Sequence, residues 1–117
     1  MRSPAFNVKI NHKYDVSATI DTGATGSMIQ LNIVEMAHLT VYPTKHSAEQ
    51  ADGLSNLNVV GEVHTFITLD DDLVLPISAV VVTELKEDIL IGTLFLKQNK
   101  MVLDFGTDSI RVKGRDI

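Results

Sequence analysis

One short stretch sets residues capable of chemistry between two apolar segments. Asp21, Thr22 and Gly23 follow the largely apolar Ala18-Thr19-Ile20 and come shortly before apolar residues 28–29. A carboxylate in such surroundings loses hydration, which is costly unless hydrogen bonds or charges compensate for it. Asp21 is therefore a candidate for acid–base chemistry. Gly23 lets the backbone turn and lets another chain approach closely, and the Thr22 hydroxyl can bond neighbouring backbone groups.

An ordinary turn is the simpler interpretation of the same three residues. In such a turn Asp21 bonds its own backbone and Gly23 adopts a positive φ. The flanking residues favour the chemical interpretation, because a turn between surface strands is not usually bordered by apolar residues on both sides.

Composition limits the classes of fold and partner. The length of 117 residues suits one domain, residues 1–117. Apolar residues make up 44% and aromatic residues 5%, so the core must consist mostly of Val, Ile and Leu, which favours strands. A net charge of -5 leaves no basic surface for nucleic acid. The absence of cysteine excludes disulfides and thiol chemistry.

Signals for membranes, metals and cofactors are missing from the sequence. No apolar run is long enough to span a membrane and no signal-peptide pattern opens the chain, so we expect no membrane partner. These observations do not fix the compartment, but they favour an intracellular one. The histidines are scattered without the spacing of metal ligands, so we expect no metal and no cofactor; they are His12, His38, His46 and His64.

The N-terminal half must position Asp21. Alternating apolar residues predict strands at 6–10 and 14–20, paired through a turn at 11–13, with Asp21 at the end of the second strand. A short helix is expected at 32–39, with Asn32 as its N-cap and Tyr42-Pro43 ending it.

The C-terminal half reads as further short strands, which makes the chain mainly β with one or two short helices. Pro76 indicates an edge or bulge position in an otherwise buried strand. Acidic residues 70–72 could be a calcium site, but the ligand spacing is missing and a solvated turn is favoured. The expected strands are 59–69, 73–82, 88–92, 101–105 and 109–113, and the expected helix is 93–98.

A polar, turn-rich segment lies between the two halves. Residues 47–61 contain Asp52-Gly53, the strongest short signal for a hairpin. The arms are too polar for a core strand, so we expect a β-hairpin that projects from the body. A plain surface hairpin is the alternative.

Three segments, taken together, resemble one known family. Asp21-Thr22-Gly23-Ala24, the Asp52-Gly53 hairpin and Ile89-Leu90-Ile91-Gly92, in this order and at these separations, are similar to the retropepsins. These are the aspartic proteases of retroviruses and LTR retrotransposons. The resemblance covers residues 6–105, and residues 51–63 look more like retrotransposon or cellular retroviral-like members than lentiviral ones. It implies a closed β-barrel, the acid-protease half, in a homodimer.

The chemistry of peptide hydrolysis agrees with this resemblance. A base must activate water and an acid must polarise the carbonyl, and two carboxylates about 3 Å apart that share one proton supply both. This chain has one candidate acid of that type, so a working pair needs Asp21 from each of two copies. The implied function is a homodimeric aspartic endopeptidase, with an acidic to mildly acidic optimum, that cleaves extended, polyprotein-like peptides. The alternative is a non-catalytic dimerisation or peptide-binding domain.

The resemblance also implies roles for individual residues. Asp21 would be the catalytic carboxylate, Thr22 would bond its mate across the dimer, and Gly23 would offer its carbonyl to substrate. Residues 47–61 would be the flap that closes over substrate. Gly92 would let the Asp21 loop pack closely. The implied substrate-binding residues are Thr19, Ala24, Thr25, Met28, Ala51, Asp52, Gly53, Leu90 and Ile91.

Two positions depart from the viral pattern. Viral members often carry an acid where Thr25 stands and an arginine where Thr93 stands, and these two can form an ion pair. Because both are replaced together, we expect a rewired support for the motif rather than a broken one. The strands expected within 101–113 would contribute the dimer sheet.

Overall fold

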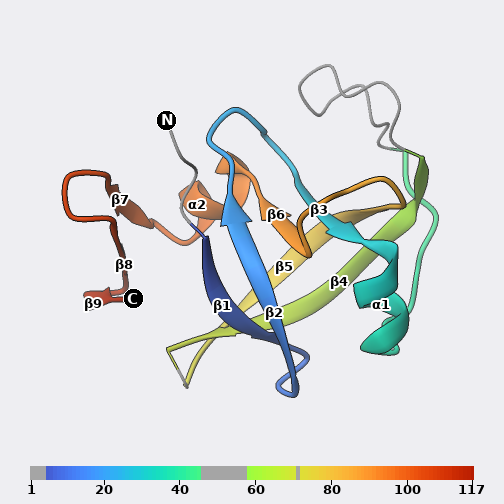
Figure 1. The fold of residues 1–117 in the computed structure, drawn as a ribbon, viewed down its shortest axis with the longest axis horizontal. Coiled ribbons are helices and arrows are strands. Elements are labelled where there is room, and N and C mark those ends of the chain that lie inside the picture. The colour runs from blue at the N-terminus through green and yellow to red at the C-terminus, as the bar shows by residue number, and fades with distance from the viewer. Residues whose placement is uncertain (1–4, 46–57, 71) are drawn as a thin grey trace.

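A closed barrel of six strands forms the body of the protein (Figure 1). The computed structural model describes residues 5–45, 58–70 and 72–117. Around the barrel the strands follow the order β1-β2-β6-β3-β5-β4. Their bounds are β1 Ala5–Ile10, β2 Tyr14–Ile20, β3 Ser27–Gln30, β4 Val59–Leu69, β5 Leu73–Val82 and β6 Ile89–Ile91. The expected mainly β, barrel-like fold is confirmed.

The N-terminal hairpin is confirmed as predicted. β1 and β2 pair antiparallel from Ala5 opposite Thr19 to Ile10 opposite Tyr14. Their connection turns through Asn11 and His12, both with positive φ, a conformation that asparagine and histidine tolerate better than most residues. The hairpin delivers the end of β2 to the barrel rim.

The longest elements of the barrel are β4 and β5, and their bounds match the predicted 59–69 and 73–82. The prediction that 73–82 is a buried strand is wrong in part, because Val74, Pro76 and Ser78 alternate outward and are exposed. Pro76 occupies the expected edge position. β3 pairs with β5 only from Ala79 onward, so the edge of β5 that faces β3 has no strand partner at Pro76. The missing proline N–H therefore breaks no hydrogen bond there.

Strand β3 was not expected, and it joins the motif to the rest of the barrel. It is parallel to β5 and antiparallel to β6, while β6 is parallel to β2. The three residues of β6 therefore lie between the two strands that flank the Asp21 loop. With four residues, of which three are fully inside, β3 has no alternation that a sequence pattern could reveal.

The first helix differs from its prediction at both ends. Helix α1 spans Leu31–Met36, and the Gln30 side chain accepts from the Asn32 N–H at 2.6 Å, so Gln30 and not Asn32 is the N-cap. The helix ends well before Tyr42-Pro43, because His38 adopts a positive φ of 55°. The second helix, α2 (Thr93–Gln98), has the predicted bounds.

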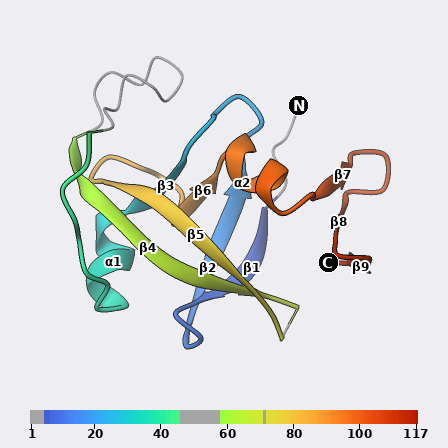
Figure 2. The same ribbon diagram turned by 180° about the vertical axis from the view of Figure 1, so that it is seen from behind.

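The C-terminal strands form a second sheet beside α2 (Figure 2). It contains β7 (Val102–Asp104), β8 (Ser109–Val112) and β9 (Arg115–Asp116), and the last strand was not expected. Ile110 and Val112 are buried in the same core as the barrel residues. The second sheet is therefore an integral part of the fold. In the described ranges, no helix is long and apolar enough to cross a membrane.

Candidate active site

Asp21 lies immediately after β2, at the rim of the barrel. Its backbone N–H donates to the Ile91 carbonyl at 2.9 Å, which extends the pairing of β2 with β6 by one residue. The Gly23 N–H donates to Asp21 Oδ1 at 2.8 Å, and the Ala24 N–H donates to the Asp21 carbonyl at 3.2 Å. Asp21 is partly buried, whereas Thr22 and Gly23 are exposed. The carboxylate is thus held by its own loop at an accessible edge.

Of the two features expected of an ordinary turn, the Asp21 loop has only the first, the bond from Asp21 to its own backbone. Asp21 does bond backbone two residues ahead, as such a turn requires. Gly23 does not adopt the expected positive φ, since Gly114 is the only glycine in the described ranges that does. The glycine is therefore not present to provide a left-handed turn.

Helix α2 holds the Asp21 loop through backbone bonds. The first N–H groups of a helix have no partner inside the helix. Here the Thr93 N–H donates to the Ala24 carbonyl at 2.8 Å, and the Leu94 N–H donates to the Thr25 carbonyl at 3.0 Å. Thr25 and Thr93, the two positions at which the viral ion pair is replaced, each take part in one of these bonds, Thr93 with Ala24 and Thr25 with Leu94. That these bonds replace the viral ion pair as support for the motif stays a prediction.

Gly92 brings the loop and the helix into close contact. A Cβ at Gly92 would clash with the backbone carbonyl oxygens of Thr25 and Gly26. The Gly92 N–H donates to Ser27 Oγ at 3.1 Å, in a buried position. The close approach that was expected of Gly92 is present, and a larger residue there would push the loop away.

A second apolar cluster, separate from the main core, lies against the motif. Its buried members are Ala24, Met28, Val82, Leu85 and Leu90, and Val59 and Val80 pack against it half-buried. Ala24 belongs to the loop itself, so the cluster begins within three residues of Asp21. Three residues expected to contact substrate, Ala24, Met28 and Leu90, are brought together here.

Of two further residues expected to contact substrate, Thr19 is partly exposed and Ile91 is buried. Thr19 is half-buried and pairs with Leu90 across β2 and β6. The side chain of Ile91 is fully enclosed in the main barrel core, so the expectation that it lines a substrate subsite is corrected to a packing role. In a three-residue strand, neighbouring side chains point to opposite faces, and only Leu90 faces the second cluster.

Two supporting residues were missed by sequence reasoning. Ser27 is buried and accepts from Gly92. Asp88 accepts from the Ser17 N–H at 2.9 Å through its carboxylate and from the Gln30 N–H at 3.0 Å through its carbonyl, which fixes β6 between β2 and β3. The available signal for Ser27 is a small hydroxyl residue directly before the apolar residues 28–29, because a polar group buried with them needs a partner.

The proposed flap lies largely outside the described residues. Ala51, Asp52 and Gly53 fall within 46–57, as does most of the hairpin 47–61. The described part is its C-terminal arm in β4, where Val59 packs on the second cluster. Gly61 packs closely there as well, since a Cβ would clash with the Tyr42 carbonyl.

Other acidic residues have ordinary structural roles. Asp104 Oδ1 accepts from the Gly106 and Thr107 N–H groups at 3.0 and 3.3 Å, a local turn on an exposed sheet. Asp72, in the acidic turn considered for calcium, is paired with Arg115. Within the described part of the chain, no group of three or more His, Asp or Glu residues could hold a metal ion.

The chain matches a family model and several curated proteins. The family model for gag-polyprotein putative aspartyl proteases matches residues 6–98. Among curated proteins, the chain is 26% identical over 102 residues to DNA damage-inducible protein 1 of Neurospora crassa, covering 87% of this chain and 23% of that protein. It is 29% identical over 112 residues to the UBA domain-containing protein Mud1 of Schizosaccharomyces pombe, covering 95% and 33%. The chain thus spans a third or less of these relatives.

Solved structures show the same fold. The retroviral protease-like domain of Ddi1 from Leishmania major superposes with a TM-score of 0.78 at 21% identity, over 99% of this chain and 92% of that one. A retropepsin-like aspartic protease from Rickettsia conorii gives a TM-score of 0.58 at 16% identity, over 87% and 76%.

Proposed function

Since this chain belongs to the gag-polyprotein aspartyl protease family, within the retropepsins, we propose that it is an aspartic endopeptidase that acts as a homodimer. The observation that supports this best is the way Asp21 is held. Its carboxylate accepts from Gly23, its backbone extends the β2–β6 pairing, and its loop is fixed to α2 by two further bonds. A carboxylate positioned so firmly at an accessible rim suits a reaction that needs exact placement of a base.

The proposed reaction uses Asp21 from each of two copies, which share one proton. The ionised carboxylate takes a proton from water, and the water oxygen attacks the peptide carbonyl while the protonated partner donates to the carbonyl oxygen. The tetrahedral intermediate then collapses, the amide nitrogen is protonated and the C–N bond breaks. Because one carboxyl must stay protonated, cleavage is expected to be fastest at acidic to mildly acidic pH.

Apolar side chains of the substrate are proposed to contact the second apolar cluster. Met28 and Leu90 form part of it beside the Asp21 loop, with Val80 half-exposed at its edge. Thr19 borders it through its pairing with Leu90. These neighbours favour extended, polyprotein-like peptides with apolar residues around the scissile bond, and burial of one such side chain contributes roughly 1.5–3 kcal/mol.

Asp21→Asn tests the proposal. The asparagine can still accept from Gly23 but cannot act as a base, so we expect cleavage of an apolar peptide library to fall by a factor of about 100 or more. Peptide products are measured by mass spectrometry from about pH 3 to about pH 8, a range that covers the expected acidic optimum and neutral pH. Inhibition by a pepstatin-type compound is expected in the wild-type chain.

Asp104→Asn is the matched control. Asp104 makes the same contact to a glycine two residues ahead, but on an exposed sheet. Cleavage should be unchanged in this variant. Equal activity in the Asp21→Asn and wild-type chains would refute the proposal. Dimers that bind apolar peptides without cleaving them would instead support the alternative of a binding domain.

A further inference from the structure

Three side chains on the outer face of the β4–β5 hairpin form a connected polar chain. Ser78 Oγ lies 2.7 Å from His64 Nδ1, and His64 Nε2 lies 2.9 Å from Glu62 Oε2. Ser78 is exposed, His64 is half-exposed at 51% and Glu62 is 24% exposed at its side chain. Nothing in the proposed protease reaction uses these residues.

The partners of the imidazole decide where its proton lies. An ionised carboxylate can only accept hydrogen bonds, so the proton shared with Glu62 is on Nε2. In a neutral imidazole Nδ1 is then unprotonated, and it accepts from the Ser78 hydroxyl. A hydroxyl bonded to a basic nitrogen, whose ring is oriented by an acid, is the arrangement of an activated serine nucleophile.

The register of the strands explains why the three side chains meet. The backbone N–H and C=O of Glu62 bond Tyr42, each at 2.8 Å, and so face away from β5. Backbone groups alternate along a strand, so those of His64 also face away from β5. His64 and Ser78 are direct partners and form a non-hydrogen-bonded pair, in which side chains approach most closely.

Tyr42 helps to hold the imidazole in place. Its ring lies 5.7 Å from the His64 ring, centroid to centroid, tilted by 45°. Its backbone is bonded to Glu62, so one residue restrains both the base and the acid. The orientation of the imidazole is therefore fixed from two sides, by Glu62 at Nε2 and by Tyr42 at its face.

We propose that Ser78, His64 and Glu62 form a second reactive site, which hydrolyses activated aryl esters through an acyl-serine intermediate. Ser78 Oγ attacks the ester carbonyl carbon as its proton passes to His64 Nδ1. The bond from carbon to the phenolic oxygen breaks, and the proton on Nδ1 passes to the departing phenolate. Water then attacks the acyl group, again giving a proton to His64, and the acid leaves as that proton returns to Ser78 Oγ.

The surroundings of Ser78 set the class of ester. An open sheet face offers little to hold a developing oxyanion, so the leaving group must be a stable phenolate. Exposed Pro76 and half-buried Val80 flank Ser78 on the same face of β5, and the Tyr42 ring lies next to His64. These apolar and aromatic neighbours suit a flat aryl group with a short acyl chain.

The full chain with 4-nitrophenyl acetate as the probe tests this site. We expect a burst of nitrophenolate and an acetyl group on Ser78, located by peptide mass mapping of the wild-type chain. Ser78→Ala and His64→Ala should each lower the rate of ester hydrolysis by about 100-fold. Glu62 is a positioning residue, so Glu62→Gln should lower the rate by about 10-fold or more, and Glu62→Asp should restore part of it.

Free imidazole hydrolyses activated esters slowly, so the histidine control is essential. His38 is exposed on another part of the surface, and His38→Ala should leave the rate unchanged. The same rate loss in His38→Ala and His64→Ala, or acetylation of lysines without Ser78, would overturn the proposal. Asp21→Asn should keep the ester activity, which makes this site testable whether or not the chain cleaves peptides.

Discussion

At the scale of single residues, an acid followed by glycine two positions on is not enough to make a site. Asp21 and Asp104 both accept from such a glycine, at 2.8 and 3.0 Å. Asp104 is exposed at the end of β7, whereas the loop of Asp21 is bonded to β6 and to α2. What distinguishes Asp21 is the support that the rest of the fold gives to its loop.

Gly92 is the residue on which that support depends. Gly92→Ala should push the loop carbonyls at 25 and 26 away from the helix, which we expect to destabilise the fold by about 1–3 kcal/mol and to reduce peptide cleavage. The free energy of unfolding in urea measures the first effect.

Gly26→Ala is the neighbouring control, because a Cβ there meets nothing within 4 Å. Its unfolding midpoint should stay close to that of the wild-type chain. If the two variants unfolded at the same urea concentration, the close approach at Gly92 would not matter for stability.

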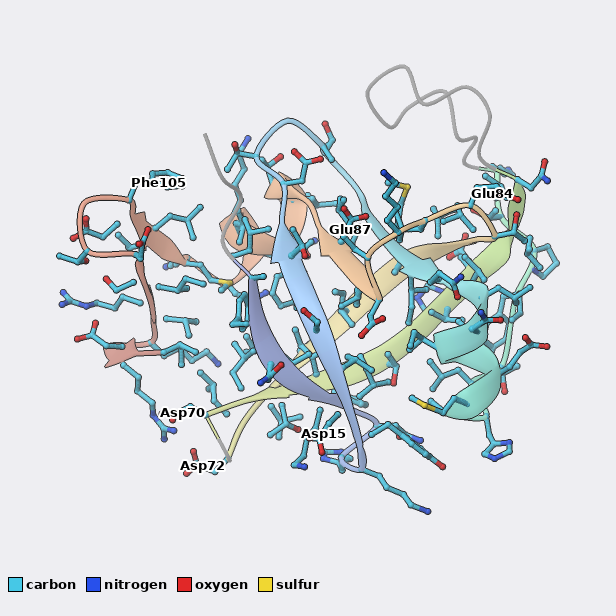
Figure 3. The ribbon with its side chains drawn as sticks, viewed as in Figure 1. Asp15, Asp70, Asp72, Glu84, Glu87 and Phe105 are labelled. Carbon is cyan, nitrogen blue, oxygen red and sulfur yellow. The ribbon has the colours of Figure 1, made fainter. Side chains whose placement is uncertain are left out.

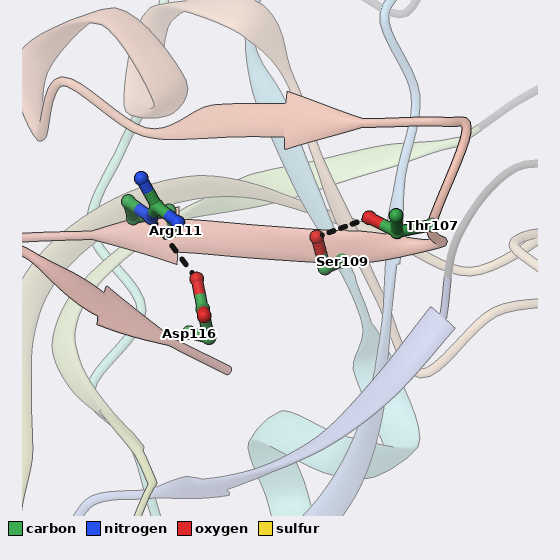
Figure 4. A network of polar contacts seen from close by, with 4 residues as sticks. All are labelled: Thr107, Ser109, Arg111 and Asp116. Carbon is green, nitrogen blue, oxygen red and sulfur yellow. Dashed lines mark hydrogen bonds and ion pairs between the residues drawn. The ribbon is translucent and has the colours of Figure 1, made fainter.

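At the scale of elements, the second sheet is fastened to the barrel at its last strand. Arg115 in β9 pairs with Asp72 in the β4–β5 turn, and Asp70 and Asp72 lie together at that end of the hairpin (Figure 3). Within the sheet, Arg111 bonds Asp116 at 3.0 Å and Thr107 bonds Ser109 at 2.8 Å (Figure 4). These contacts are exposed, so each contributes little alone.

The ion pair between Asp72 and Arg115 makes stability depend on pH. The hydrogen bond from Arg115, and secondly its charge, lower the pKa of Asp72 from its ordinary value. A carboxyl group whose pKa is lower in the folded state stabilises the fold above its unfolded pKa, about 4 for aspartate. That contribution is lost as pH falls through the lower folded pKa.

Asp72→Asn should therefore lower the thermal midpoint at about pH 6, and the difference from wild type should shrink as the pH falls below about 4. Thermal unfolding followed by circular dichroism measures this. Asp108→Asn, at an exposed acid in the turn between β7 and β8, should show no such trend. A constant difference between Asp72→Asn and wild type at every pH would contradict the assignment.

At the scale of the whole molecule, the proposed dimer would have to form through surfaces that the single chain leaves exposed. In the second sheet β8 is central, with β7 and β9 on either side, so only the outer strands can pair with another chain. Val102 in β7 is 58% exposed, and Phe105 just beyond it is 45% exposed. Removing all residues after Phe105 would also remove Ile110 and Val112 from the core, so truncation is a poor test.

Point substitutions separate dimerisation from folding. Phe105→Lys should give monomers in sedimentation velocity and no peptide cleavage at low protein concentration, because a charge would be placed in the proposed interface. Phe66→Lys is the matched control, since Phe66 is 47% exposed on the β4–β5 hairpin. It should leave the dimer intact. A Phe105→Lys chain that remains dimeric would exclude this part of the sheet from the interface.

The sequence alone determined the elements whose signal is local. Apolar residues along 59–69 and 73–82 set β4 and β5, and the acidic residues 70–72 between them set the turn. The segment with Asp21 and the family resemblance were also readable, because the residue types that a carboxylate site needs are adjacent in the chain. Helix α2 was predicted with its observed bounds, because its signal is also local in the sequence.

Only the tertiary structure decided how separate segments meet. Strand β3, strand β9 and the burial of Ile91 depend on barrel closure and on partners far along the chain. The bonds from Thr93 and Leu94 to the Asp21 loop, and the contact of Ser78 with His64, join residues with no shared local pattern. Local periodicity reports which face of a segment is apolar, but it does not report which other segment will cover that face.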